Sequence, residues 1–250
     1  MHLRDLVRYL DEYLNVANVP DSTRAFNGLQ LENTGSVTRL AAAVDFSQAS
    51  IAQAVDAGAD LLLVHHGMFW GGSERHTGHR YHRLASLIKH NVAVYSAHLP
   101  LDVHPVVGNN AVLARALGIR VAGPFGEECG IAIGLWGELD MSRDDLVARV
   151  GSVLGCSPRV LPFGPARVRR VGVLTGSGGS FIPQAETAGL DTYLTGEGPH
   201  HTFFEAEERR LNVLFGGHYA TETVGVKALA AHLSEKFQLP WTFLDHPTGM

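Results

Sequence analysis

The chain is poor in cysteine, in long apolar runs and in positive charge. Its 250 residues include only two cysteines, which argues against a disulfide scaffold and fits a reducing compartment. No apolar run approaches the ~20 residues that a membrane span needs, and the charged residues Arg4 and Asp5 stand where a signal peptide would be apolar. The formal net charge of -5 gives no electrostatic basis for general nucleic-acid binding. We therefore expect a cytoplasmic protein with no membrane partner and no general affinity for nucleic acid.

The remaining composition is that of a folded protein. Hydrophobic residues make up 45% of the chain and charged residues 18%, so a full core is expected and disorder is not. The length suits one large α/β domain or two small ones. The 14 histidines are the one compositional excess, and they indicate either metal binding or a histidine-rich lineage.

Short apolar runs alternate with helical segments along the whole chain. Residues 40–44 and 61–64 have the pattern of buried strands, and the alanine-rich segment 48–57 between them has the pattern of a helix. This alternation predicts an α/β fold with mostly parallel sheets. The pattern restarts around Gly123-Pro124. We therefore predict a first α/β domain over 1–123, completed by a C-terminal helix within 221–250, and a second α/β domain over 124–220.

The two halves of the chain resemble each other. Val37 to His66 aligns without gaps on Val168 to Glu197, and Ala57-Gly58-Ala59-Asp60 falls on Ala188-Gly189-Leu190-Asp191. Unrelated α/β units also resemble each other in composition, which is the alternative explanation. We favour two similar three-layer α/β domains related by internal duplication, with their strand ends converging on a cleft that holds a metal site.

Histidines and carboxylates follow the apolar runs at several points. His65 and His66 end one predicted strand, and in both halves a later strand leads to a histidine with a carboxylate four residues on. These two pairs are His98 with Asp102 and His218 with Glu222. Chemistry in open α/β sheets lies beyond the carboxyl ends of the strands. Imidazole and carboxylate ligands together suit zinc, iron, manganese, cobalt or nickel.

Each of these residues has a structural alternative. The adjacent pair His65 and His66 could be surface side chains at a turn. Neighbouring strand residues point to opposite faces, so the pair serves one site only where the strand ends, or else serves two ions. The carboxylates Asp102 and Glu222 could simply favour helix N-termini, and His98 could pack beside the site or support a ligand instead of binding metal.

Four weaker features have alternative explanations. Glu197, in Thr195-Gly196-Glu197, is a candidate general base or part of a solvated turn. The glycine turn 176–179 could offer backbone amides to a phosphate or simply connect a strand to a helix. In the polar loop from Gly67 to about His79, Phe69 and Trp70 could stack a base or anchor the loop. For the pair His200-His201 we favour a surface role, with contact to a substrate as the alternative.

Taken together, several motifs resemble the Nif-three family, whose members are often labelled type-two GTP cyclohydrolase I homologues. The resemblance covers nearly the whole chain. It rests on Asn27-Gly28-Leu29-Gln30, Ala59 to Gly67 with Phe69-Trp70, His98-Leu99-Pro100-Leu101-Asp102, Thr195-Gly196-Glu197 and Gly217 to Glu222.

The resemblance implies two divalent metal ions per chain and a ring-shaped homohexamer. The implied ligands are His65, His66, Asp102, His218 and Glu222, with Glu222 bridging and His98 close by. Such a centre would activate water for hydrolysis, so we expect a metal-dependent hydrolase acting on a nucleotide or another phosphorylated small molecule. The alternative is a non-catalytic metal-binding protein or a regulatory scaffold.

Overall fold

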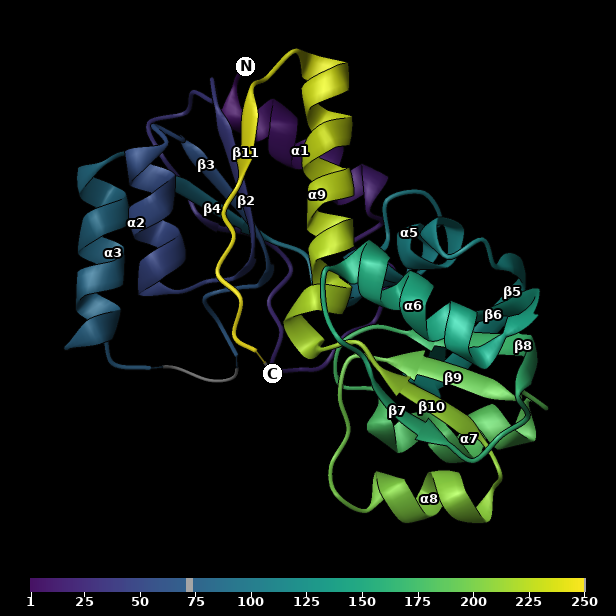
Figure 1. Cartoon of the computed structure of the whole chain (residues 1–250). Helices are drawn as coiled ribbons and strands as arrows, with labels where there is room; N and C mark the ends of the chain where they lie inside the picture. Colours follow the sequence, from purple (N-terminus) through teal and green to yellow (C-terminus); the bar gives the residue numbers. More distant parts are fainter. Residues whose placement is uncertain (71–73, 250) are drawn as a thin grey trace. The chain divides into compact units, whose positions relative to one another are not determined.

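A computed structural model describes residues 1–70 and 74–249 of the chain. By its internal contacts the chain divides into two units (Figure 1). Unit 1 comprises Met1–Val107 and Val226–His246, and unit 2 comprises Gly108–Gly225 and the residues from Pro247 onward. Among the described residues, no helix has the length and apolar character needed to cross a membrane. The predicted loop 67–79 includes residues 71–73, which lie outside the described residues.

Unit 1 contains a five-stranded, largely parallel sheet with the strand order β1-β4-β3-β2-β11. Its strands are β1 (Gly28–Leu31), β2 (Leu40–Asp45), β3 (Leu61–His66), β4 (Ala93–Ser96) and β11 (Trp241–Phe243). Strands β4, β3, β2 and β11 are parallel, and β1 pairs with β4 in the antiparallel sense. Strand β11, near the end of the chain, forms one edge of the sheet.

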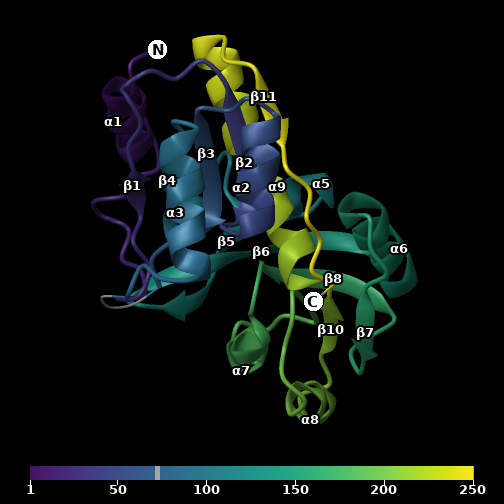
Figure 2. The same ribbon diagram turned by 90° about the vertical axis from the view of Figure 1, so that its left-hand side faces the viewer.

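Helices cover both faces of this sheet. They are α1 (Leu3–Tyr13), α2 (Gln48–Asp56), α3 (His79–Lys89), the single turn α4 (Leu99–Asp102), and the C-terminal part of α9 (His218–Phe237), which begins in unit 2. Figures 1 and 2 show α2 and α3 on one face and α1 with α9 on the other. Leu62 and Val64 of β3 pack in one core cluster with Ile51 of α2 and Leu87 of α3. Strand alternation therefore turns His65 toward the opposite face.

An aromatic stack joins α1 to the end of α9. The His232 ring lies parallel to Tyr13, with ring centroids 4.2 Å apart. The Tyr9 hydroxyl lies 2.5 Å from Nε2 of His232. These partly buried contacts pack α1 against the C-terminal part of α9.

Stability at acidic pH is expected to depend on His232. Burial lowers the pKa of His232, and Lys236 lowers it further, whereas Glu235 acts in the opposite direction. The unfolded chain takes up a proton near the ordinary pKa of about 6.5, while the folded state keeps the ring neutral to lower pH. The stabilising contribution is therefore complete above that value and is lost as the pH falls from it through the lower pKa of the folded state.

The measurement is urea denaturation of the wild type and of His232→Phe at neutral pH and near pH 5. We expect the wild type to lose more free energy of unfolding on acidification than the variant does. An equal loss in both proteins would show that His232 makes no contribution to the pH dependence.

Unit 2 contains a six-stranded sheet with the order β5-β6-β8-β9-β10-β7. Its strands are β5 (Arg120–Glu128), β6 (Ile131–Ser142), β7 (Arg159–Pro162), β8 (Arg167–Leu174), β9 (Thr192–Thr195) and β10 (Asn212–Phe215). Only β8, β9 and β10 are parallel; the other strands pair in the antiparallel sense. The expectation of mostly parallel sheets was therefore wrong for this unit.

Strand β5 accounts for one of the three antiparallel pairs. It forms a hairpin with β6 through Cys129 and Gly130, both of which have positive φ angles. The strand runs through Gly123-Pro124, where the sequence pattern restarts. Proline is tolerated there because β5 is an edge strand, and the register shifts between Val121 and Gly123. Glycine and proline thus mark an irregular edge strand that sequence periodicity does not detect.

The helices of unit 2 also form two layers. They are α5 (Asn109–Ala116), α6 (Arg143–Leu154), α7 (Ile182–Thr187), which follows a short 3₁₀ turn η1 (Gly179–Phe181), and α8 (Thr202–Glu208). Leu113 of α5 and Leu146 of α6 pack in one cluster with Val171 and Val173 of β8. Figure 1 shows α7 and α8 on the other side of the sheet. Each unit is therefore a three-layer α/β arrangement, as predicted.

The two units share a set of backbone hydrogen bonds at equivalent positions. These positions are 131 residues apart, as in the alignment of Val37 to His66 on Val168 to Glu197. In unit 1 the Asp60 carboxylate accepts hydrogen bonds from the backbone amides of Thr38 and Arg39. In unit 2 the Asp191 carboxylate accepts from the amides of Arg169 and Arg170. Two glycines at this offset, Gly58 and Gly189, each end a helix with a φ of 65°. Repetition of these specific contacts favours internal duplication over similarity of composition.

Candidate metal centre

His65 and His66 end strand β3, and each ring is held through Nδ1. The Nδ1 of His65 donates to the carbonyl oxygen of Ala97 at 2.9 Å, and the ring is fully buried. The Nδ1 of His66 donates to Oδ1 of Asp45 at 2.8 Å. Asp45 is the last residue of β2 and stands in register with His66. Parallel pairing therefore brings the Asp45 carboxylate to the imidazole that it orients.

His98 follows β4 and is held in the same way. Its Nδ1 donates to Oδ1 of Asp21 at 2.9 Å, and its backbone amide donates to Oδ1 of Asn27. Burial opposes ionisation of Asp21, but hydrogen bonds from His98, Asn27 and the Leu99 amide outweigh it and lower the pKa of Asp21. The loop before β1 therefore presents an ionised carboxylate that fixes the orientation of His98.

The three histidines form a group that could hold a metal ion. One ring nitrogen of each lies within 4.8 Å of the others. Because each Nδ1 donates to an oxygen, the lone pair is left on Nε2. Metal-bound histidines typically have this arrangement, with the second nitrogen bonded to a carboxylate or a carbonyl. The donors that surround His65, His66 and His98 therefore fit a divalent ion.

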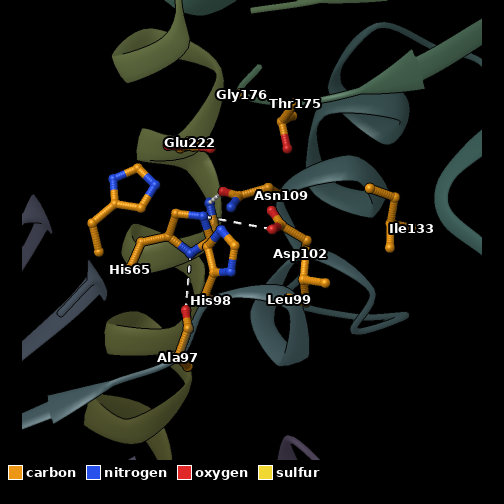
Figure 3. A network of polar contacts seen from close by, with 12 residues as sticks. His65, Ala97, His98, Leu99, Asp102, Asn109, Ile133, Thr175, Gly176 and Glu222 are labelled. Carbon is orange, nitrogen blue, oxygen red and sulfur yellow. Dashed lines mark hydrogen bonds and ion pairs between the residues drawn. The ribbon is translucent and has the colours of Figure 1, made fainter. Parts of the chain in front are cut away.

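Asp102 adds a carboxylate to the histidine group of unit 1. It is the last residue of the single turn α4, which starts directly after His98 with Pro100 in its first turn. Its side chain is 10% exposed, and Oδ2 lies 3.5 Å from Nε2 of His65 (Figure 3). Two ligands that share a tetrahedral ion with bonds near 2.1 Å are about 3.4 Å apart. The separation of Asp102 and His65 matches that geometry.

Unit 2 holds a second histidine–carboxylate pair. The sequence predicted a C-terminal helix within 221–250, but α9 begins earlier, at His218. His218 and Glu222 are thus four residues apart on one helical face. Nε2 of His218 lies 3.2 Å from Oε2 of Glu222, which is 3% exposed. This separation also suits two ligands of one ion.

The electrostatics around His218 show why a cation is favoured there. Burial opposes the charged form of His218, but hydrogen bonds and attraction from Glu222 and Glu197 outweigh it and raise its pKa to about 9. Two carboxylates therefore hold a positive charge on one imidazole. A bound divalent ion would compete for the same nitrogen, because metal binding requires neutral histidine.

Glu197 lies where it positions His218. Its Oε1 accepts a hydrogen bond from Nδ1 of His218 at 2.8 Å. This contact repeats the way in which Asp45 holds His66 and Asp21 holds His98. The structure thus gives Glu197 an orienting role in addition to the hypothesis of a general base.

The glycine turn of unit 2 uses its amides within the chain. The amide of Gly176 donates to Oγ1 of Thr221, that of Gly178 to Oγ1 of Thr195, and that of Gly179 to the Glu197 carbonyl. These bonds favour a tightly packed connection from strand to helix over a phosphate cradle. Gly176 has a φ of 70°, and a Cβ there would collide with the Glu222 carboxylate. Only glycine lets this turn lie against Glu222 (Figure 3).

Sequence reasoning missed the side chains that orient the histidines. Asp45 could have been found, because it ends the strand that precedes β3 and the rule on strand ends applies to it. Asp21 gave no such signal, because it lies in an irregular segment between α1 and β1. The buried Asn110 was also missed. Its side chain bonds the Ile133 carbonyl and the Thr175 amide and ties α5 to the sheet of unit 2.

Two further features named in the sequence analysis are the pair His200-His201 and Trp70. His200 and His201 are both exposed, in agreement with the surface role that we favoured. Trp70 is half-buried, and its ring contacts both His66 and His98.

Comparisons with known proteins find a matching family, similar sequences and similar solved structures. A family model described as Duf34/NIF3 (NGG1p interacting factor 3) matches residues 1–248. The chain is 45% identical to the GTP cyclohydrolase 1 type 2 homolog of Deinococcus radiodurans, over 98% of this chain and 94% of the relative. It resembles the crystal structure of TTHA1606 from Thermus thermophilus, with 42% identity, a TM-score of 0.91 and full coverage of both chains. It also resembles protein ybgI, described as of unknown function, with 38% identity, a TM-score of 0.93 and full coverage of both chains.

Proposed function

The chain belongs to the Duf34/NIF3 family, and within it we propose that the protein is a metal-dependent hydrolase. Its substrate is a nucleotide or another phosphorylated small molecule. The proposal includes two divalent ions per chain, drawn from zinc, iron, manganese, cobalt and nickel. The proposed ligands are His65, His66 and Asp102 of unit 1 and His218 and Glu222 of unit 2, with His98 as a supporting residue or a further ligand.

One observation carries this proposal. Three imidazoles of unit 1 are each anchored at Nδ1 by an oxygen acceptor, and one nitrogen of each falls within 4.8 Å of the others. Histidines that merely pack in a core need no such common orientation. Their shared anchoring, of the kind that supports metal-bound histidines, supports metal binding as the reason for the arrangement.

The residues of the chain have two proposed roles, orienting the imidazoles and supplying negative charge. Asp21, Asp45 and Glu197 hold the imidazoles in the orientation and tautomer that a ligand needs. The buried carboxylates of Asp102 and Glu222 supply negative charge that offsets that of a cation. Bound divalent ions would supply polarisation of a phosphoryl oxygen and activation of water.

The test is hydrolysis by metal-loaded protein of nucleoside mono- and triphosphates, simple phosphodiesters and cyclic amides. We expect turnover that falls at least about 100-fold in His218→Ala, because loss of a ligand costs more than loss of its support. His90→Ala, which changes an exposed histidine of unit 1, serves as the control and keeps full activity. No turnover by metal-loaded wild type on any of these compounds would remove the support for an enzyme.

A specific observation favours the alternative of a non-catalytic metal-binding protein or regulatory scaffold. The candidate base, Glu197, is hydrogen-bonded to His218, and the glycine-turn amides named above are bonded within unit 2. On this reading the histidines and carboxylates retain a metal without transforming a substrate. Turnover that disappears in His218→Ala and survives in His90→Ala would exclude it.

The ring-shaped homohexamer implied by the family resemblance stays a prediction. Light scattering on the purified protein would then give a mass six times that of the 27.0 kDa chain.

A further inference from the structure

Trp70 borders the histidine group of unit 1. Its ring centroid lies 5.0 Å from that of His98 and 5.6 Å from that of His66, with interplanar angles of 83° and 61°. Trp70 is only partly buried. Tryptophan is large and rarely fully buried, so the case for a binding role rests on its position beside the two histidines.

A network of hydrogen bonds fixes the segment that carries Trp70. The Gln30 side chain donates from Nε2 to the Phe26 carbonyl and accepts at Oε1 from the Met68 amide, each at 2.6 Å. Nε1 of Trp70 donates to the Gly67 carbonyl at 3.1 Å. A Cβ at Gly67 would lie 2.5 Å from the Gln30 side chain. The indole is therefore held in place before any ligand arrives.

Two further aromatic rings strengthen this segment. Phe26 and Phe69 meet edge to face with centroids 6.2 Å apart, and Ala25 forms a backbone bridge with Trp70. Phe26 remains 65% exposed. Three large aromatic side chains thus lie on two segments that non-covalent contacts hold together. These aromatic rings lie on the segments that flank the histidine group of unit 1.

We infer that Trp70 is a stacking platform for the planar heteroaromatic ring of the ligand that the histidine group binds. This inference rests on the proposed function and narrows its substrate class to anionic compounds that carry such a ring, such as nucleoside phosphates. The anionic group reaches toward the metal-binding histidines while the ring lies on the indole. Stacking on an aromatic side chain tolerates any base, because every base has a π-face.

The competing explanation is that Trp70 only anchors the loop after β3. The two roles predict different effects of a Trp70 substitution on the binding of ligands with and without an aromatic ring. A platform discriminates between ligands with and without a ring, whereas an anchor affects both equally.

The experiment measures calorimetric binding of adenosine 5′-monophosphate and of ribose 5-phosphate to metal-loaded protein. These probes share a sugar phosphate and differ in the base. We expect the wild type to bind the nucleotide about tenfold or more tightly than the sugar phosphate, as one stacked base predicts. Trp70→Leu loses this preference and Trp70→Phe keeps part of it. Tyr81→Leu, which removes an aromatic side chain that is 56% exposed on α3, keeps all of it.

Metal content, measured on the same samples, separates the possible failures. Equal binding of the two probes by metal-loaded wild type would overturn the inference, as would binding of neither probe. An unchanged preference in Trp70→Leu would overturn it too. A wild type that takes up no metal would overturn the proposed function itself, because the histidines would then have no ion to hold.

Discussion

Replacing Asp102 by asparagine, or Glu222 by glutamine, is expected to strip metal from the protein. Both carboxylates are buried, with residue exposures of 8% and 3%, and each lies within 3.5 Å of a histidine Nε2. A carboxylate attracts a divalent ion by charge, and this attraction is strong where water is excluded. The amide keeps the shape of the side chain and removes the charge. We therefore expect metal affinity to fall at least about 100-fold, more than for loss of a supporting residue.

The measurement is elemental analysis of purified, untagged protein after dialysis. Wild type should contain about two ions per chain if both are held as proposed. Asp56→Asn, at an exposed position of α2, and Glu235→Gln, at an exposed position of α9, are the matched controls and retain the full content. Thermal unfolding followed by circular dichroism shows whether each variant is folded. Wild-type metal content in both folded variants would mean that Asp102 and Glu222 are not ligands.

Introducing a single methyl group at Gly196 is expected to destabilise unit 2 strongly. A Cβ at this position would lie 2.5 Å from the Gly176 carbonyl oxygen and 2.8 Å from Cα of His218. Both neighbours are backbone atoms, so no side chain can rotate away to make room. The loop after β9, which carries Glu197, would have to move apart from the start of α9. We expect Gly196→Ala to lower the free energy of unfolding by about 3 kcal/mol.

Gly189→Ala is the matched control for this effect. Gly189 has a φ of 65°, and a Cβ there would meet no atom within 4 Å. Its substitution therefore costs only backbone strain, about 1–2 kcal/mol. Urea denaturation of both variants gives the comparison. An equal loss in the two would show that the loop after β9 adjusts and that the contact of Gly196 with His218 is not tight.

Much of each unit follows from local patterns in the sequence. The run Leu61 to Val64 is a buried strand because continuous apolar residues are stable only where both faces of a sheet are covered. The internal repeat aligned Asp60 with Asp191, and the structure shows that both carboxylates accept hydrogen bonds from backbone amides. Strand β5 was missed because Gly123 and Pro124 interrupt the pattern on which strand prediction depends.

The candidate site was predictable to a smaller extent. Histidines and carboxylates after strands point to a site because parallel strands end at one edge of a sheet. The partners that orient the histidines could not be predicted as a set. Asp21 lies 77 residues before His98, and no periodicity relates an irregular loop to a residue so distant in the chain.

The sequence by itself determined the family, the α/β class, the repeat and the positions of the metal-binding residue types. These follow from residue identity and spacing, which act over a few neighbouring positions. Only the tertiary structure decided that each Nδ1 of His65, His66 and His98 is bonded, that His218 and Glu222 share one helical face, and that Trp70 stands beside the histidines. Orientation of a side chain depends on contacts between segments remote in sequence, and such contacts exist only after the chain has packed.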